Sequence, residues 1–371
     1  MKADLTTENL KKSAYWIIII FGVVYALIYF RSFLEPIVLA LLLWYLIRTT
    51  RKYIGKITIR GKSLPNWLQR VVAFLITLSF FYGIYQIISV NVSLISANAD
   101  SYDGNLRLFL QQLRDFTSEY DFLPNIDETV QSIDYQSILS RTFNSLSVVL
   151  GNFALVIVYV IFFLIEENYL SQKLTNMFTK EGSRKNVSDI FERISGAVNK
   201  YFTVKTEVSL LTGSISYVVL LLLGVDFPVL WAFIIFVLNY IPYVGSLVAT
   251  LLPSIFAIFQ FASFWPFVYV FLIVESVQIL VGNYIEPKLM GRTLNLSPLV
   301  VIIALSFWGT IWGVLGMILS VPFISVIVII SAQFPSTRGL AILLSENGNI
   351  SPVAPEEYEV QKDSQSQAQS I

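Results

Sequence analysis

The sequence predicts an all-α, polytopic integral membrane protein with about six crossing helices, two opposed re-entrant helical hairpins that form an inverted repeat, and amphipathic helices. Three observations predict this fold class. Of the 371 residues, 55% are hydrophobic and only 13% are charged, with a mean hydropathy of +0.68, whereas about 25% of residues are charged in an average soluble domain. Several apolar runs approach the roughly 20 residues that a helix needs to cross a bilayer. Basic and acidic residues also cluster in different loops.

The residue types that are missing exclude most enzyme classes. The chain has no Cys and no His, which removes thiol nucleophiles, imidazole bases and the commonest zinc ligands. An intramembrane protease would need a Ser with a His, or two Asp residues within spans, and Asp226 is the only Asp in the membrane half. Basic and acidic residues balance, and none of the basic ones lies between Lys205 and Lys288, which excludes a strongly basic nucleic-acid surface. We expect no enzyme, no cofactor and no nucleic-acid partner.

The crossing helices are expected where apolar runs contain few charges. The first run has no small-residue cleavage site before the next one, so we expect a retained helix rather than a signal peptide. Two further apolar stretches, Pro228–Ala262 and Pro298–Gln333, are too long for one untilted crossing. The six expected crossings are Ala14–Phe30, Phe33–Ile47, Leu68–Val90, Leu146–Ile165, Val208–Val225 and Phe264–Gly282.

The positions of Lys and Arg predict the orientation, because basic residues in short loops stay in the cytoplasm. Residues 48–62 and 166–206 contain clusters of Lys and Arg and are expected inside, together with the amino terminus. The charged residues of 91–145 are mainly acidic, and this segment is expected outside. Lys288 and Arg338 then lie inside if Pro228–Ala262 leaves the membrane on the side where it entered. The expected location is a bacterial cytoplasmic (inner) membrane with both termini in the cytoplasm.

These loops divide the chain into five segments. In the external one, Leu106, Phe109 and Leu110 recur at helical spacing, which predicts an amphipathic helix that lies on a surface or packs on the domain. The composition beyond Ser351 is too polar to bury an apolar core, which predicts disorder. The segments are 1–90 (membrane helices), 91–145 (external), 146–206 (membrane helix and cytoplasmic amphipathic segment), 207–335 (transport core) and 336–371 (disordered tail).

Helix-breaking residues interrupt both long stretches near their middle. Pro242 and Gly245 interrupt the first, and the run from Gly309 to Gly316 interrupts the second. Non-helical backbone at membrane depth is tolerated only where protein buries it or where it lines a watery cavity. Paired interruptions in two halves of a chain indicate the midplane site of a secondary transporter.

The two interrupted stretches also align with each other. Each follows a crossing helix, so the core contains two copies of a crossing helix and a hairpin in opposite orientations. Aligning Pro228 with Pro298 sets Gly245 near Gly316. We therefore expect an inverted repeat whose two interruptions face each other.

Three runs of this core resemble a known family. They are YFTVKTEVSLLTG from residue 201, a run from 222 that contains IPYVG, and a run from 283 that contains EPKLMG and LSPLVV. Over about residues 10–335 the chain resembles the autoinducer-2 exporter (AI-2E) family of bacterial multi-pass transporters. The resemblance implies export of the quorum-sensing signal autoinducer-2, or antiport of Na⁺ or Li⁺ against protons. It also implies a homo-oligomer, of which a pentamer is one form.

The candidate binding residues lie at the interruptions and in the crossing helix 264–282. An ionised carboxylate in the middle of a crossing helix, such as Glu275, costs several kcal/mol unless it is paired, hydrated or protonated. We therefore interpret Glu275 first as a functional residue. Gln278 shares its helix face. The structural alternative is that Gln278 bonds a neighbouring helix and Glu275 satisfies the amides of a broken hairpin. The candidates for substrate or ion binding are Asn239, Pro242, Gly245, Ser246, Glu275, Gln278, Asn283, Gly309, Gly313 and Gly316.

Glu286 and Lys288, at the inner end of the same helix, are candidates for a gate, with an interfacial ion pair as the alternative. The expected partners are membrane lipids, protons, and either a small polar solute or an alkali cation, because both kinds of cargo use oxygen ligands. A passive channel and a non-transporting scaffold stay open, since broken helices also build pores. Glu275 together with the inverted hairpins favours a proton-coupled carrier.

Overall fold

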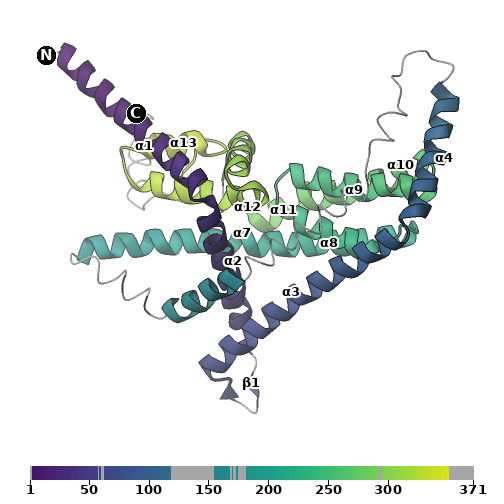
Figure 1. Cartoon of the computed structure of the whole chain (residues 1–371). Helices are drawn as coiled ribbons and strands as arrows, with labels where there is room; N and C mark the ends of the chain where they lie inside the picture. Colours follow the sequence, from purple (N-terminus) through teal and green to yellow (C-terminus); the bar gives the residue numbers. More distant parts are fainter. Residues whose placement is uncertain are drawn as a thin grey trace, which may run out of the picture. The chain divides into compact units, whose positions relative to one another are not determined.

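The computed structural model consists almost entirely of helices (Figure 1). It describes residues 2–56, 58–59, 62–117, 154–167, 169, 173, 181–291 and 295–350. Within these ranges, 6 helices are long and apolar enough to cross a membrane. The prediction of an all-α polytopic membrane protein is therefore confirmed. The chain forms two compact units, the first from Met1–Leu78, Ser147–Leu174 and Ser306–Met317, the second from Ser79–Leu146, Thr175–Leu305 and Ile318–Ile371.

The first unit is held together by apolar packing and one bidentate ion pair. Arg51 donates to both carboxylate oxygens of Glu167, at 2.6 and 3.1 Å, so the end of α2 is tied to the end of the helix at 154–167. The first residues of the expected crossing Leu146–Ile165 lie outside the described residues. The elements of this unit are α1 (Lys2–Tyr29), α2 (Arg31–Ile54), the start of α3 (Asn66–Ala97) and the antiparallel pair β1 (Thr58–Ile59) and β2 (Lys62–Ser63).

The second unit surrounds a core of large apolar side chains that includes Trp231, Ile235, Phe256 and Val274. Its longest helix, α7, joins the expected cytoplasmic amphipathic segment and the next crossing helix into one rod, because no Pro interrupts it. The elements are α4 (Ala99–Thr117), α7 (Glu181–Leu222), α8 (Pro228–Leu238), α9 (Val244–Phe261), α10 (Phe264–Leu280), the π-helix η1 (Val281–Ile285), α11 (Glu286–Met290), both ends of α12 (Pro298–Gln333), and α13 (Arg338–Leu344).

The stretch Pro228–Ala262 folds back on itself as a helical hairpin of α8 and α9. At its turn, the Val244 N–H donates to the Pro242 carbonyl at 2.6 Å around Tyr243, whose φ of 59° and ψ of −63° form the rare, strained kind of γ-turn. At the other end, the Gln260 side chain donates to the Gly224 carbonyl and accepts from the Asp226 N–H, both at 2.8 Å. The two ends of this hairpin therefore lie together.

The stretch Pro298–Gln333, α12, also contains an interruption. Trp312 (φ −125°, ψ 20°) and Gly313 (φ 57°, ψ −139°) leave the helical conformation inside the expected Gly309–Gly316 break. The positive φ at Gly313 is a conformation that glycine adopts without a steric penalty. Leu296, just before α12, packs against the cluster that contains Ala332 from its end. Both predicted helix breaks are present, and the ends of each interrupted stretch come together.

One glycine closes each hairpin. A Cβ atom on Gly245 would lie 1.9 Å from the carbonyl oxygen of Leu238, and a Cβ atom on Gly316 would lie 1.9 Å from the carbonyl oxygen of Trp308. Atoms do not approach this closely, so only glycine lets the two arms meet at these positions. The alignment of Gly245 with Gly316 in the sequence therefore has a counterpart in the backbone.

The amphipathic helix α4 packs on the base of the first hairpin. Asn105 donates to the Gln260 carbonyl at 2.8 Å, and the Tyr102 hydroxyl donates to the Asp226 carboxylate at 3.0 Å. Burial and then the hydrogen bond to Asp226 raise the pKa of Tyr102 to about 12. Leu106 is buried while Arg107 is exposed, as the helical spacing predicts. Residues 118–145 of the expected external segment lie outside the described residues.

The segment 338–350, which the expected boundary 336–371 includes in the disordered tail, is ordered. It forms α13, and its apolar residues Ala341 and Ile350 are buried in one cluster with Val328 and Ala332. These residues supply the apolar burial that the polar sequence beyond Ser351 lacks. Residues 351–371 lie outside the described residues.

We expect Gly245→Ala to weaken the first hairpin, because the added methyl group must push the two arms apart. The expected loss is about 3 kcal/mol in the free energy of unfolding, measured by SDS titration in mixed micelles. Gly83→Ala in α3 is the control, since nothing lies within 4 Å of a Cβ atom there. Equal stability of both variants would contradict the close approach at Gly245.

Candidate functional site

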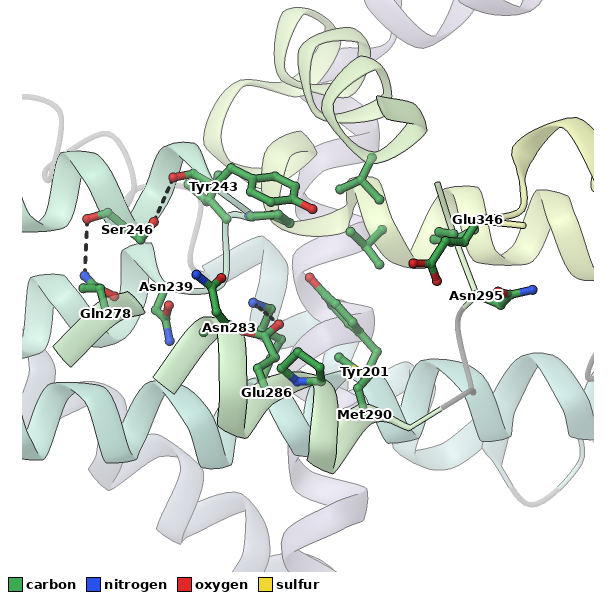
Figure 2. A pocket seen from close by; sticks show the side chains of 18 of the residues that line it. Tyr201, Asn239, Tyr243, Ser246, Gln278, Asn283, Glu286, Met290, Asn295 and Glu346 are labelled. Carbon is green, nitrogen blue, oxygen red and sulfur yellow. Dashed lines mark hydrogen bonds and ion pairs between the residues drawn. The ribbon is translucent and has the colours of Figure 1, made fainter. Parts of the chain in front are cut away.

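A polar pocket of about 900 Å³ lies in the second unit (Figure 2). Its walls come from α7, from the turn between α8 and α9, and from the continuous run of α10, η1 and α11. Val301 and Val321, on either side of the break in α12, and residues 295–296, 346–347 and 349 beside it complete the wall. Most of the labelled side chains in Figure 2 are polar. Such a pocket between membrane-length helices can hold a hydrophilic molecule.

Buried amide side chains line the inner wall of the pocket and hold the hairpin turn. Asn239, 8% exposed, donates to the Ser209 hydroxyl at 3.2 Å. Gln278, 5% exposed, donates to the Ser246 carbonyl at 3.3 Å. Gln278 therefore bonds a neighbouring helix, as the structural alternative for this residue proposed, and it also lines the pocket.

Glu275 lines the same pocket one helical turn before Gln278. Its Oε2 atom is buried and has no hydrogen-bond partner among the described residues. An unpartnered buried oxygen costs free energy because it has lost its water. The atom is therefore free to accept a hydrogen bond or to coordinate a cation.

Among the described residues, the pocket wall has one ammonium group, and it is already paired. Lys205 of α7 is 5% exposed, and its Nζ atom lies 2.5 Å from Oε1 of Glu286 on α11. This pair joins two helices beside the pocket. The expected gate contained Glu286 and Lys288, but Lys288 is absent from the pocket wall, and the described partner of Glu286 is Lys205.

Three irregular backbone segments border the pocket. The first is the γ-turn at Tyr243, the second is the π-helix η1, and the third is the chain at 295–296 before α12. Single π-helical turns and strained residues occur often at functional sites. The pocket is therefore bounded by backbone that departs from regular helix on several sides.

The structure brings most of the predicted residues of the second unit together. Gly245 is the exception, because it is buried inside the hairpin against Leu238. Gly309, Gly313 and Gly316 belong to the first unit, at the break of α12. The predicted residues that line the pocket are Asn239, Pro242, Ser246, Glu275, Gln278, Asn283 and Glu286.

The sequence did not indicate several residues of the pocket. Tyr201 and Lys205 precede the expected crossing helix, and Glu346 lies in the expected tail. Lys205 lies at the end of the cytoplasmic amphipathic segment, and this position was the one feature of the sequence that could have suggested a buried ion pair. Nothing in the composition of 338–350 pointed to the pocket.

The helices and the pocket define an integral membrane protein with a polar site among membrane-length helices, the class to which solute transporters belong. The comparisons with known proteins identify the family. The model for AI-2E family transporters matches residues 15–336, and the chain belongs to this family.

Similar proteins come from several bacteria. A Borreliella burgdorferi protein named for a proposed transport role is 27% identical over 331 residues, which cover 88% of this chain and 89% of that protein. The AI-2 transport protein TqsA of Escherichia coli is 31% identical over 250 residues, 66% of this chain and 71% of TqsA. A Haemophilus influenzae protein, also named for a proposed transport role, is 31% identical over 300 residues, 77% and 83% of the two chains. These names are those of transporters and not of enzymes.

We expect the Lys205–Glu286 pair to show a large coupling energy. Lys205→Met leaves the half-buried carboxylate of Glu286 unpaired and should lower the free energy of unfolding by about 3 kcal/mol. Adding Glu286→Gln should restore most of the loss, as measured in a double-mutant cycle. The exposed pair Arg107–Asp103 is the control and should couple by less than about 1 kcal/mol. Equal coupling in both cycles would contradict a buried pair.

Proposed function

We propose that the chain is a secondary transporter of the inner membrane that moves a small polar solute through the polar pocket, with Glu275 as the site of proton coupling. TqsA is named for the transport of AI-2, so export of this signalling molecule is the leading proposal for the cargo. The two interrupted helix pairs are proposed to enter and leave the membrane on the same side, as re-entrant hairpins.

The observation that carries the proposal is the buried, unpartnered Oε2 atom of Glu275 in the pocket wall. A carboxylate without a partner can take up a proton, or it can bind a donor group of the cargo. The two events compete for one oxygen, and that competition is the physical basis of proton-coupled exchange. Gln278 and Asn239 supply amide groups on the same wall.

An alkali cation is the second candidate cargo, in exchange for protons. Glu275, Asn239 and turn carbonyls offer the oxygen ligands that such an ion prefers. The volume of about 900 Å³ favours a polar solute, because it lies in the range of about 300 to 1,000 Å³ typical of pockets for small molecules.

The contacts in the second unit support the proposed orientation. The external helix α4 binds Asp226 and Gln260 at the base of the first hairpin, which agrees with a hairpin that enters from outside. Lys205, which the positive-inside rule places in the cytoplasm, pairs with Glu286, and Glu286 lies two residues before the basic Lys288. Both termini are proposed to lie in the cytoplasm.

We predict that Glu275→Gln folds and assembles like the parent chain but loses transport driven by a pH gradient, because Gln keeps the shape and cannot release a proton at this site. The measurement is uptake of autoinducer-2 into proteoliposomes with an imposed pH gradient. Glu207→Gln is the matched control, since Glu207 is exposed and absent from the pocket wall. Full pH-driven transport by Glu275→Gln would remove the proposed coupling role.

The same proteoliposomes separate the other functions. Saturable exchange of autoinducer-2 supports a carrier of this solute, and saturable Na⁺ or Li⁺ exchange supports the antiporter. Conductance that does not saturate indicates a channel, and the absence of all flux indicates a scaffold.

We predict that position 101 faces the outside and position 52 the cytoplasm. Ser101→Cys and Lys52→Cys give single labelling sites, because the chain has no native Cys. A maleimide that does not cross membranes should label only the first in intact cells and both after permeabilisation. Labelling of position 52 alone in intact cells would reverse the proposed topology.

A further inference from the structure

The segment 345–350, which we call the C-terminal rim, borders the polar pocket and lies beyond the residues that match the family. We propose that Glu346 on this rim sets the charge selectivity of the pocket, so that it accepts neutral or cationic polar solutes and rejects anions. The part about transported solutes rests on the proposed function. The part about the negative electrostatic potential that Glu346 adds to the pocket does not.

Several contacts fix the rim beside α12. The Glu346 N–H donates to the Asn295 carbonyl at 3.1 Å, and the Ser297 N–H donates to the Leu344 carbonyl at 3.1 Å. The Asn295 side chain donates to the Asn349 carbonyl. Ile350, 1% exposed, anchors the end of the rim in its apolar cluster. The rim is therefore held at a defined place on the wall of the pocket.

The rim forms one exposed end of the pocket wall. Glu346, Asn347 and Asn349 are exposed, whereas Lys205, Asn239 and Gln278 in the same pocket are buried. In Figure 2, Glu346 and Asn295 lie far to one side of the pocket from Ser246 and Gln278. A solute that enters from the rim therefore passes Glu346 before it reaches the hairpin turn.

The charges of the pocket do not cancel. The described residues of its wall carry the carboxyl groups of Glu275, Glu286 and Glu346 and one ammonium group, that of Lys205. Lys205 is paired with Glu286, so the carboxyl groups of Glu275 and Glu346 have no cation among the described residues of the wall. A cleft lined by one sign of charge concentrates ions of the other sign and repels its own. The pocket should therefore repel anions.

A thiol reporter inside the pocket measures this field without any knowledge of the cargo. Ser246→Cys is nearly isosteric, and the full-length chain otherwise has no Cys. Methanethiosulfonate reagents with a trimethylammonium, a hydroxyl or a sulfonate head group differ mainly in charge. Their rates of reaction with the purified chain in detergent give a cation-to-anion ratio. Ser188→Cys, exposed on α7 and absent from the pocket wall, corrects for intrinsic reactivity.

We expect the cationic reagent to react faster than the anionic one at position 246, and Glu346→Gln to lower this ratio by about twofold. Glu346→Lys should lower it further. Glu192→Gln, an exposed acid outside the pocket wall, should leave the ratio unchanged. If the parent chain shows no transport but has the expected cation-to-anion ratio at position 246, the result contradicts the proposed function and not this inference.

Two results would overturn the inference. One is a ratio at position 246 that stays the same in both Glu346 variants. The other is no reaction of Ser246→Cys with any of the three reagents, since the pocket would then not be reached from the rim.

Discussion

Backbone amides and carbonyls cannot stay unpaired in an apolar environment, and the turn between α8 and α9 shows how this chain meets that constraint. A helix that ends in the middle of an apolar stretch leaves carbonyl groups without partners. The Tyr201 hydroxyl of α7 donates at 3.4 Å to the carbonyl of Tyr240, which follows the end of α8. Gln278 of α10 adds a hydrogen bond to the Ser246 carbonyl in the first turn of α9. The interrupted hairpin therefore requires a polar helix face on each side of it, and those faces form the walls of the pocket.

The glycine contact decides how sharply each hairpin can fold. At Gly245 and Gly316 the second arm touches a carbonyl oxygen of the first, so the arms diverge from a fixed point. Strain at Tyr243 has the same origin, because the chain must reverse within very few residues. The sharp turn thus has two results. The arms pack closely at Gly245 on one side of it, and the polar pocket lies on the other.

Sequence periodicity and helix-breaking residues predicted the elements well, because both are local. Pro242 and Gly245 marked the first turn, and Gly313 marked the second. Contacts between distant segments were not predictable in this way. Lys205 and Glu286 are each ordinary charges in the sequence, and only the packing of α7 against α11 makes them a buried pair. The order of 338–350 likewise depends on an apolar cluster with α12.

Gln278 and Glu275 lie on one helix and differ in their hydrogen bonding, and they therefore have opposite effects on the stability of the fold. Gln278 has found a carbonyl partner, so its burial stabilises the hairpin turn. Glu275, one turn away, has a buried oxygen with no hydrogen-bond partner among the described residues, and this burial lowers the stability of the fold. An apolar or amide side chain at this position would serve the fold better. In the mechanism that we propose, a proton or a donor group of the cargo supplies this partner, and the free energy lost at the unpaired oxygen contributes to binding.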